Sequence, residues 1–554
     1  MESQLCQELQ QLSPEQLRKL LSASGHGELL RNDNDTYVVD EKLVTELKSE
    51  GNTFFRQGRI HDAVSAYSRC IDLDPKNAVC HSNRAAAYLK ACISHPLNYF
   101  DHAITDCSKA IAIAPTIKPF MRRATAHIGL KQFCQAVDDL TAALELEPRN
   151  KECFAKLQAI VEIATSVPGS DNNINQELRK ASARALAIVS LRQGWSIIAV
   201  RGNPAPSAVN GHTLFTGSDG RIYLFGGRAV REQKPQVFVR DERDNTSWSL
   251  VPICGLGAPL SCAWHSTSSI GSKARDIFCV YGGVSSRGED SCVHLLVPSS
   301  PRGFQWRQVH CMQDPTTIPV PRSGHAAVSI GECNDQQAVF IFGGRTKRGV
   351  SNQLHVLRLH TGNSESDASG LEDMTISWTE ISTRDQANSV SWPSARDGHS
   401  MCLLQSEANT APRLIVFGGN GQLNDDKKND VWIFDVEKQF WRFLQCSGDI
   451  PPPRSYHTAH AVGEFLFIVC GRTAAFEDDS IFMLDIEEAL WYKLPVPCDQ
   501  SFSPRAWHSS VLTKAGKLFV LGGGTYHGPL KKAAELDLSY FCLKAPMVTC
   551  KRRG

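Results

Sequence analysis

Residues 47–77 read LKSEGNTFFRQGRIHDAVSAYSRCIDLDPKN, and this stretch decides the fold of the first part of the chain. Its apolar residues recur at the spacing of an amphipathic helix. Gly58 interrupts the pattern after one helix length, and Pro75 ends it. The stretch therefore predicts two consecutive helices joined by a tight turn.

Two later stretches follow the same plan. They are SNRAAAYLK with YFDHAITDCSKAIAIAP, residues 82–90 and 99–115, and RRATAHIGLKQFCQAVDDLTAALELEP, residues 122–148. Gly51 and Ala85 are equivalent small residues 34 positions apart. Each unit also has an alanine where its helices must pack closely and a proline where it ends: Ala63, Ala103, Ala136, Pro75, Pro115 and Pro148. The second unit carries extra residues around 93–98, which we expect to lengthen the turn between its helices.

These coordinated positions resemble the tetratricopeptide repeat family, whose repeats are helix pairs of about 34 residues. The resemblance implies three helix pairs stacked into a superhelix. The segment KECFAKLQAIVEIATSV, residues 151–167, resembles the capping helix that such arrays need, because the last repeat would otherwise expose its apolar face.

From about residue 194 the sequence changes to a strand pattern. Six apolar runs end in glycine: YLFGG, FCVYGG, FIFGG, LIVFGG, LFVLGGG and the weaker FIVCG. A histidine precedes each run, namely His212, His265, His325, His399, His457 and His508. A tryptophan lies 16 to 21 residues before each histidine, namely Trp195, Trp248, Trp306, Trp378, Trp441 and Trp491.

This pattern resembles the kelch repeat and implies a six-bladed β-propeller with four strands per blade. We expect the glycine pairs to let strands crowd near the axis and the tryptophans to fill the wedges between blades. We expect WSIIAV, residues 195–200, to supply the outer strand of the last blade and so close the ring. Closure by the C-terminal segment is the alternative.

The fold class is therefore multidomain, α followed by all-β. We expect an N-terminal amphipathic helix (LSPEQLRKLLSA) and linker in residues 1–40, tetratricopeptide repeats with a capping helix in 41–166, a linker and connecting helix in 167–193, and the propeller in 194–554. The acidic residues 363–374 predict a disordered loop in the third blade.

Composition excludes several classes of function. The formal net charge of +1 gives no overall field for nucleic acid or membrane. No apolar run is long enough to span a bilayer, and the start of the chain lacks the pattern of a secretory signal. The 19 cysteines are scattered without a C-x-x-C pair, so we expect reduced thiols and a cytoplasmic protein.

Five polar residues recur on the first helices of the three helix pairs. Lys48 and Asn52 are one turn apart on one helix face, Lys118 and Arg122 are one turn apart on another, and Asn83 lies on the helix between them. We expect the five side chains to converge on one surface. Solvated faces of amphipathic helices also carry such residues, but rarely at matched positions in three segments.

The five residues match the carboxylate-clamp version of the tetratricopeptide family. The resemblance implies a groove for the acidic C-terminal tails of cytosolic heat-shock chaperones. Lys48, Asn52 and Asn83 would hold the terminal carboxylate, and Lys118 and Arg122 would hold a side-chain carboxylate nearby. Salt should weaken such binding.

The sequence therefore predicts a non-enzymatic co-chaperone adaptor, without cofactor, metal, nucleic-acid or membrane partner, whose propeller binds a client or a second protein. The alternative is a kelch substrate receptor of a ubiquitin ligase, although residues 1–40 are too short for a BTB fold. A propeller enzyme is the third hypothesis, which a bound metal would support. We expect the six histidines to be structural, satisfied by neighbouring backbone. Four arginines are likewise repeat residues, and some of them would face the channel mouth and bind a partner: Arg322, Arg396, Arg454 and Arg505.

Overall fold

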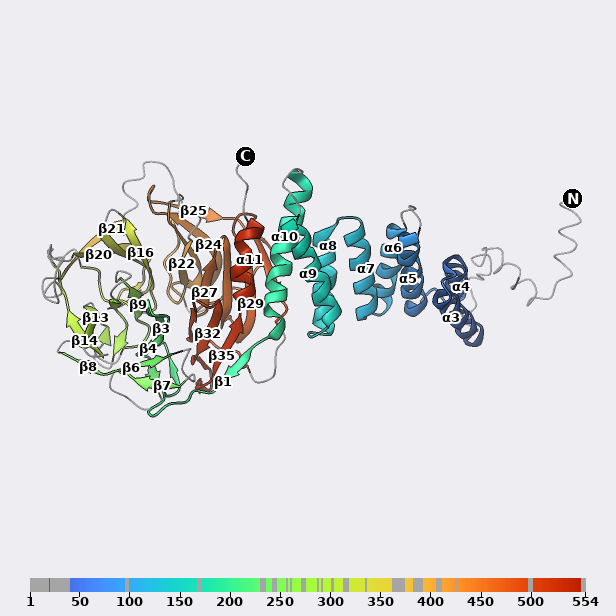
Figure 1. The fold of residues 1–554 in the computed structure, drawn as a ribbon. Coiled ribbons are helices and arrows are strands. Elements are labelled where there is room, and N and C mark those ends of the chain that lie inside the picture. Colours follow the sequence, from blue (N-terminus) through green and yellow to red (C-terminus); the bar gives the residue numbers. More distant parts are fainter. Residues whose placement is uncertain are drawn as a thin grey trace, which may run out of the picture. The chain divides into compact units, whose positions relative to one another are not determined.

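The computed structural model describes most of both repeat regions (Figure 1). The described residues are 19, 40–94, 99–166, 172–229, 236–241, 247–255, 258–259, 262–270, 276–285, 288–289, 292–299, 303–311, 318–333, 336–360, 374–381, 392–404, 411–423, 426–496 and 502–549. The expected N-terminal helix, apart from Lys19, and the acidic loop up to residue 373 lie outside this set.

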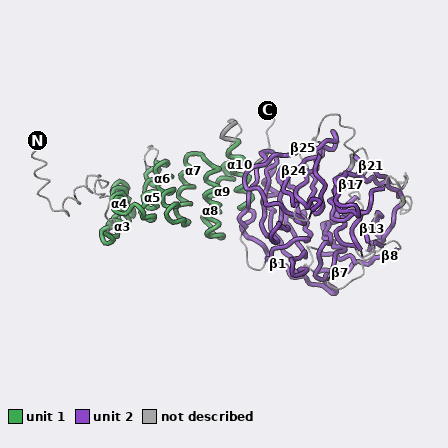
Figure 2. Tube along the Cα trace, turned by 180° about the vertical axis from the view of Figure 1, so that it is seen from behind, with its two compact units in different colours: residues 1–189, 551–554 green, residues 190–550 purple. Residues whose placement is uncertain are grey.

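The chain divides into two compact units, which are coloured separately in Figure 2. The first unit comprises residues 1–189 with 551–554, and the second comprises residues 190–550.

The described part of the first unit is helical. Its helices are α3 (Glu41–Arg56), α4 (Ile60–Leu73), α5 (Ala78–Ser94), α6 (Phe100–Ile113), α7 (Ile117–Gly129), α8 (Phe133–Leu146), α9 (Lys151–Ser166) and α10 (Asn172–Ser190). The Asp40 carboxylate caps α3 by accepting a hydrogen bond from the Leu43 N–H at 3.1 Å. Gly58 has a φ of 78°, and it forms the turn into α4 that the sequence predicted.

Small residues let the two helices of each pair approach closely. Ala63, Ala103 and Ala136 have no exposed surface. Gly51 of α3 faces the ring of Tyr67 on α4, and a Cβ at Gly51 would lie 2.6 Å from the Tyr67 ring. Any larger residue at position 51 would therefore displace Tyr67.

The first helices of the pairs form one side of the array. Contacts of α5 with α3 and α7 are more extensive than those between the second helices, α4 with α6 or α6 with α8. Because the inner side of a curved stack is the more crowded side, α3, α5 and α7 line its concave surface. Residues 95–98, within the predicted insertion, are not described, and α5 and α6 are intact on either side.

The second unit is a six-bladed β-propeller, as predicted. From the innermost strand outward, the first three blades are β3 (Thr213–Thr216), β4 (Ile222–Phe225), β6 (Val237–Arg240) and β7 (Trp248–Leu250); β9 (Ser266–Ser269), β10 (Phe278–Tyr281), β13 (Val293–Ser299) and β14 (Gly303–Gln308); and β16 (Ala326–Cys333), β17 (Gln336–Phe342), β20 (Leu354–His360) and β21 (Thr375–Ile381).

The other three blades follow the same order. They are β22 (Ser400–Leu404), β23 (Arg413–Asn420), β24 (Lys427–Asp435) and β25 (Phe440–Leu444); β27 (Thr458–Val462), β28 (Phe465–Arg472), β29 (Glu477–Asp485) and β30 (Leu490–Leu494); and β31 (Ser509–Leu512), β32 (Lys517–Leu521), β35 (Ala533–Asp537) and β1 (Ser196–Ile198). Neighbouring strands within each of these blades are antiparallel.

Short elements complete the unit. Two-stranded pairs are β2 (Val209–Asn210) with β5 (Arg228–Ala229), β11 (Val284–Ser285) with β12 (Gly288–Glu289), β18 (Arg345–Thr346) with β19 (Gly349–Val350), and β33 (Gly524–Thr525) with β34 (Gly528–Pro529). Further elements are β8 (Ile253–Cys254), β15 (His310–Cys311) and β26 (Ser447–Gly448), each parallel to an outer strand, the 3-10 turn η2 (Leu191–Gln193), and the helix α11 (Ser539–Thr549).

The ring closes through the N-terminal strand, as predicted. Strand β1 pairs with β35, with Ser196 opposite Glu535 and Ile198 opposite Ala533. The last blade therefore combines one strand from the start of the propeller with three from its end, and β35 is not left as an open edge.

Aromatic pairs fill the wedges between blades. Each of five repeat tryptophans packs against an aromatic side chain of a neighbouring blade: Trp306 on Phe225, Trp378 on Tyr281, Trp441 on Phe342, Trp491 on Phe417 and Trp248 on Phe519. These contacts confirm the role predicted for the tryptophans.

Candidate functional site

The five predicted site residues lie on the three first helices of the array. Lys48 and Asn52 are on α3, Asn83 is on α5, and Lys118 and Arg122 are on α7. Lys118 is exposed, whereas the other four are partly buried. They therefore occupy the side of the array that α3, α5 and α7 share.

Three of the five side chains are joined by hydrogen bonds. The Asn83 Nδ2 group donates to Asn52 Oδ1 at 3.1 Å, and the Arg122 guanidinium donates to Asn83 Oδ1 at 3.4 Å. Arg122 is held more firmly by Ser82, because it donates to the Ser82 carbonyl at 2.7 Å and to the hydroxyl at 2.6 Å. The resulting chain runs from α7 through α5 to α3.

The Tyr67 hydroxyl completes this arrangement. It donates to the same Asn52 Oδ1 atom at 2.8 Å, so that this oxygen accepts two hydrogen bonds. The Asn52 Nδ2 group makes no hydrogen bond with a described residue. Its two N–H groups are thus oriented as donors for an incoming acceptor such as a carboxylate.

The cations of the site lack acidic partners. Lys48, Lys118 and Arg122 form no ion pair with any residue that the structure describes. Burial lowers the pKa of the Arg122 guanidinium from its usual value, because desolvation disfavours the charged form. A bound carboxylate would offset that cost.

Neighbouring arginines show the contrasting, structural arrangement. Arg84 pairs with Asp106 at 2.8 Å, and Arg123 pairs with Asp139 at 2.7 Å. Each of the two also donates to a serine hydroxyl. Arg84 and Arg123 follow Asn83 and Arg122 directly on α5 and α7. On each helix, one residue thus forms a structural ion pair, while the residue before it lies on the candidate surface and has no acidic partner among the described residues.

Lys48 and Lys118 are not bonded to the other three site residues. They lie one helical turn before Asn52 and Arg122, respectively. Sequence reasoning also missed Tyr67 and Ser82, which orient Asn52 and Arg122. The available signal was a tyrosine at a buried position of α4, because a buried hydroxyl needs a partner.

The repeat histidines and arginines of the propeller are buried between strands. Four histidines bond through Nε2 to a hydroxyl of the preceding blade: His265 to Thr213, His325 to Ser266, His457 to Ser400 and His508 to Thr458. The partner of Nε2 is thus a side chain, whereas the neighbouring backbone expected from the sequence acts on His265 through Cys262 and on His457 through Phe417. Among the described residues no group of three or more His, Cys, Asp or Glu side chains could hold a metal ion.

The four repeat arginines have no exposed surface, so they do not form the mouth of the channel. Each donates to the carbonyl at the end of its blade's second strand, as Arg396 does to Gly418 at 3.0 Å. Arg396 also pairs with Asp430 at 2.7 Å, and Arg454 pairs with Asp478 at 2.7 Å. They stabilise the inner part of the blades.

A second candidate site lies on the propeller axis. The residues directly before the six histidines form an axial ring consisting of Gly211, Trp264, Gly324, Gly398, Tyr456 and Trp507. The Trp264 N–H donates to the Gly211 carbonyl at 2.7 Å, and the same bond repeats from blade to blade until the Gly211 N–H donates to the Trp507 carbonyl at 2.9 Å. The inner ends of the blades are therefore tied together by a closed ring of backbone hydrogen bonds.

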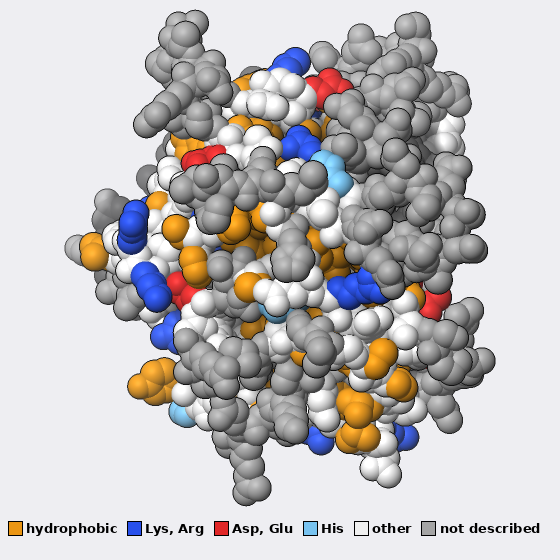
Figure 3. Space-filling model, turned by 90° about the vertical axis from the view of Figure 1, so that its left-hand side faces the viewer, with side chains coloured by type: hydrophobic (Ala, Val, Ile, Leu, Met, Phe, Trp, Pro, Cys, Tyr) orange, Lys and Arg blue, Asp and Glu red, His pale blue; other side chains and the backbone are white. Residues whose placement is uncertain are grey.

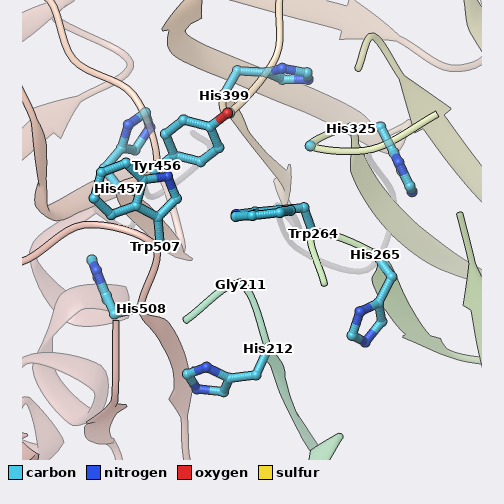
Figure 4. Close-up of a pocket in the computed structure, with 12 residues that line it drawn as sticks. Gly211, His212, Trp264, His265, His325, His399, Tyr456, His457, Trp507 and His508 are labelled. Atoms are coloured by element: carbon cyan, nitrogen blue, oxygen red, sulfur yellow. The ribbon is translucent and has the colours of Figure 1, made fainter. Parts of the chain in front are cut away.

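All members of the axial ring adopt positive φ. The values are 58° for Trp264, 52° for Tyr456 and 56° for Trp507, where a non-glycine residue costs roughly 1–2 kcal/mol. Together with the histidines the ring lines a cavity of ≈ 150 Å³. In Figure 4 the rings of Trp264, Tyr456 and Trp507 extend into this space, whereas the histidine side chains point away from its centre.

Charge on the molecular surface is local. On the face drawn in Figure 3, described basic and acidic side chains are interspersed with hydrophobic ones.

Among the described helices, none is both long and apolar enough to cross a bilayer.

Two family models match the chain. The KLHDC2/KLHL20/DRC7 Kelch-repeats domain matches residues 264–524, and a TPR repeat matches residues 51–91. The first match lies within the propeller and the second within the helical array.

Curated relatives share parts of the chain. RNA polymerase II-associated protein 3 of Mus musculus is 36% identical over 140 residues, which is 25% of this chain and 20% of the relative. Sperm-associated antigen 1 of Homo sapiens is 35% identical over 127 residues, 23% of this chain and 13% of the relative. Host cell factor 2 of Homo sapiens is 24% identical over 281 residues, 50% of this chain and 32% of the relative.

The chain thus spans a fifth or less of the first two relatives and about a third of the last. Shared segments of this kind identify repeat types and not whole proteins. Taken with the helix pairs and the six blades, the matches identify a chain that carries tetratricopeptide repeats in its helical unit and kelch repeats in its propeller.

Proposed function

We propose that this protein is a non-enzymatic adaptor of the cytoplasm. Its concave helical surface binds the acidic C-terminal tails of cytosolic heat-shock chaperones, and its propeller binds a client or a second protein. Tetratricopeptide and kelch repeats are typically non-catalytic modules for protein interaction, which supports the general role. The choice of a C-terminal tail rests on the candidate clamp.

One observation carries the proposal: donors without acceptors and cations without anions meet on the surface of α3, α5 and α7. Asn52 Nδ2 has no described partner, and neither Lys48 nor Arg122 has a described acidic partner. A terminal carboxylate offers two oxygens that accept from several donors at once. A further acidic side chain of the tail would face Lys118 and Arg122, one helix pair away.

The expected affinity is moderate. Hydrogen bonds to charged groups contribute about 1.5–3 kcal/mol each before the peptide is ordered. A few such bonds support a dissociation constant of about micromolar order. Because the site is partly exposed, binding should weaken as salt concentration rises.

The described cysteines support the cytoplasmic location. Every cysteine whose side chain the structure describes is a free thiol, and several are fully buried, as Cys107 and Cys470 are. Free thiols in this number are typical of a reducing compartment.

Calorimetry of the full chain with a synthetic acidic peptide ending in a free carboxylate tests the clamp. We expect Lys48→Ala and Arg122→Ala to weaken binding at least about tenfold each, since each loses a charged hydrogen bond. Lys109→Ala is the matched control, because Lys109 is an exposed lysine on the second helix α6. Equal affinities of the control and the two clamp variants would refute the proposed site.

A further inference from the structure

The two ends of the propeller are defined by the strand order. In blade 4, Ser400 at the start of the first strand pairs with Phe417 near the end of the second, and Leu404 pairs with Arg413. We letter the four strands of a blade A to D from the innermost outward. The loops between B and C, and the residues that lead directly into each strand A, therefore lie at one end of the propeller, which we call the B–C end. The earlier part of a segment between blades runs beside the outer strand of the next blade, as β26 does beside β30. The remaining turns lie at the opposite end.

Exposed apolar side chains are concentrated at the B–C end. All large exposed hydrophobic residues in the described propeller loops lie there: Val320, Leu423, Ile450, Phe476 and Tyr526. Leu423, Phe476 and Tyr526 occupy the B–C loops of blades 4, 5 and 6 and are exposed by 73%, 61% and 84%. Apolar side chains exposed on neighbouring loops indicate a surface that a partner covers.

At the opposite end the described turns are polar, and the exposed apolar residue there, Leu543, lies on helix α11 and not in a turn. These turns carry ion pairs, such as Arg221 with Asp241 at 3.1 Å and Arg413 with Glu464 at 3.0 Å. The contrast between the ends argues against a general tolerance for apolar loops in this propeller.

The axial cavity opens at the same B–C end. The residue before each ring member pairs with the residue that follows the glycine pair, as Asp397 does with Asn420 and Ser455 with Arg472. Those partners begin the B–C loops. The aromatic rings of the axial ring therefore lie at the centre of the surface that the exposed loops surround.

The cavity has unfilled space above Gly324. A Cβ at Gly211 would lie 2.8 Å from Trp264 Nε1, and one at Gly398 would lie 2.9 Å from the Tyr456 ring, whereas one at Gly324 would have no neighbour closer than 3.5 Å. The cavity thus combines aromatic walls with room for about one ring-sized apolar side chain.

Basic side chains lie on the first and third blades of this end. Arg228 places its guanidinium 5.3 Å from the centre of the Trp264 ring. Arg348 is exposed at the tip of the loop between β18 and β19. Neither arginine forms an ion pair with a described residue, and the exposed Lys347 adds a further positive charge near Arg348.

We propose that the B–C end of the propeller is the docking surface for an acidic, apolar peptide segment of another protein. One apolar side chain enters the axial cavity above Gly324. Its acidic side chains face Arg228 and Arg348, and a second apolar group covers Phe476 and Tyr526. This deepens the proposed adaptor role, in which the propeller takes a protein partner, and it does not depend on the clamp.

The chemistry of the surface favours a peptide over a nucleic acid. Aromatic and basic side chains would suit either. Exposed aliphatic residues such as Leu423 and Ile450 neither stack on bases nor bind phosphate, but they do pack against apolar side chains of a protein.

Selection from a phage library of random peptides, with the full chain as bait, tests the proposal. The peptides are joined to the phage coat through their C-terminal ends, so they lack the free carboxylate that the clamp would need. We expect the enriched sequences to share an acidic residue near a large apolar one. Absence of enrichment, or enrichment of sequences without acidic residues, would overturn the proposal.

Variants then locate the binding site of the enriched peptide, measured by fluorescence anisotropy. Gly324→Trp should fill the cavity, because Trp264 shows that the ring accepts tryptophan at a similar φ, 58° against 63° for Gly324. Two double variants test the rest of the surface: Arg228→Glu with Arg348→Glu, and Phe476→Ser with Tyr526→Ser. We expect each of the three variants to weaken peptide binding about tenfold or more.

Two controls separate this proposal from the clamp. Charge reversal at the opposite end, Lys438→Glu with Lys514→Glu, should leave peptide affinity unchanged, and so should Lys48→Ala with Arg122→Ala. Loss of binding in the clamp variant alone would show that the peptide occupies the helical unit. Displacement of the peptide by a single-stranded oligonucleotide at the Arg228 and Arg348 surface would contradict a protein partner.

Discussion

At the residue scale, the position after each repeat histidine decides whether a hydroxyl is present for the histidine of the next blade. In four blades the residue after the histidine carries the hydroxyl that bonds to the histidine of the next blade, as Ser400 does for His457 at 2.9 Å. In blade 6 the Ser509 hydroxyl instead accepts from the Leu214 N–H, and His212 has no hydroxyl partner among the described residues. Blade 3 has Ala326 at this position, and neither ring nitrogen of His399 has a hydroxyl partner among the described residues. An unpartnered buried polar group destabilises the fold.

Ala326→Ser should therefore stabilise the propeller. The new hydroxyl would lie where four other blades bond Nε2, and one such bond contributes about 1 kcal/mol. Chemical denaturation of the full chain measures the change. Ser400→Ala, which removes the partner of His457, should lower stability by a similar amount or more, and a destabilised Ala326→Ser variant would contradict this reading.

Tyr67 has a comparable role in the clamp. Its hydroxyl holds Asn52 Oδ1, and Tyr67→Phe leaves the ring against Gly51 but removes that bond. We expect the variant to fold and to bind the acidic peptide about three- to tenfold more weakly, because Asn52 is no longer held as a donor. Calorimetry measures this change, and unaltered affinity would show that Asn83 alone orients Asn52.

The same residues show how far the sequence could be interpreted. Helix pairs, glycine pairs, tryptophans and histidines recur at fixed spacing, so the fold and the clamp candidates could be predicted. The axial ring could not, because glycine, tryptophan and tyrosine share no chemistry. Besides their place before a repeat histidine, only a common positive φ unites Gly324, Trp264 and Tyr456, and that appears only in the folded backbone.

At the element scale, strand β1 closes the propeller by pairing with the last blade. It covers β35, and the preceding Trp195 stacks on Phe502 with ring centres 4.0 Å apart. These residues join the start of the unit to its last blade. A propeller without them would expose an unpaired strand edge.

A chain that begins at residue 200 should therefore be less stable and prone to association, whereas a chain that begins at residue 190 retains both contacts. Thermal unfolding and sedimentation of the two fragments measure the difference. A monomeric 200–554 fragment with the melting temperature of 190–554 would show that β1 is dispensable.

At the scale of the whole molecule, the ring of neutral histidines makes stability depend on pH. Burial lowers the pKa of His265, His325 and His457 from the ordinary 6.5 to about 3, and that of His212 to about 4. Near pH 6 the unfolded chain therefore binds protons that the folded propeller does not. The stabilisation is complete above pH 6.5 and is lost progressively toward pH 4 to 3.

We expect the free energy of unfolding of the propeller to fall as pH drops from 6.5 to 5, by up to about 1.4 kcal/mol per pH unit for each histidine, and the melting temperature to fall with it. Calorimetric melting across this range measures the effect. A melting temperature that stays constant or rises on acidification would contradict the buried, neutral state of these residues.

The central claim for the molecule is that its helical unit recognises the end of another polypeptide. The most direct measurement compares, by calorimetry on the full chain, one acidic peptide with a free C-terminal carboxylate and the same peptide as its C-terminal amide. The account predicts that amidation weakens binding about tenfold or more, because Lys48, Asn52 and Asn83 lose their acceptor. Equal affinity for the two peptides would contradict it.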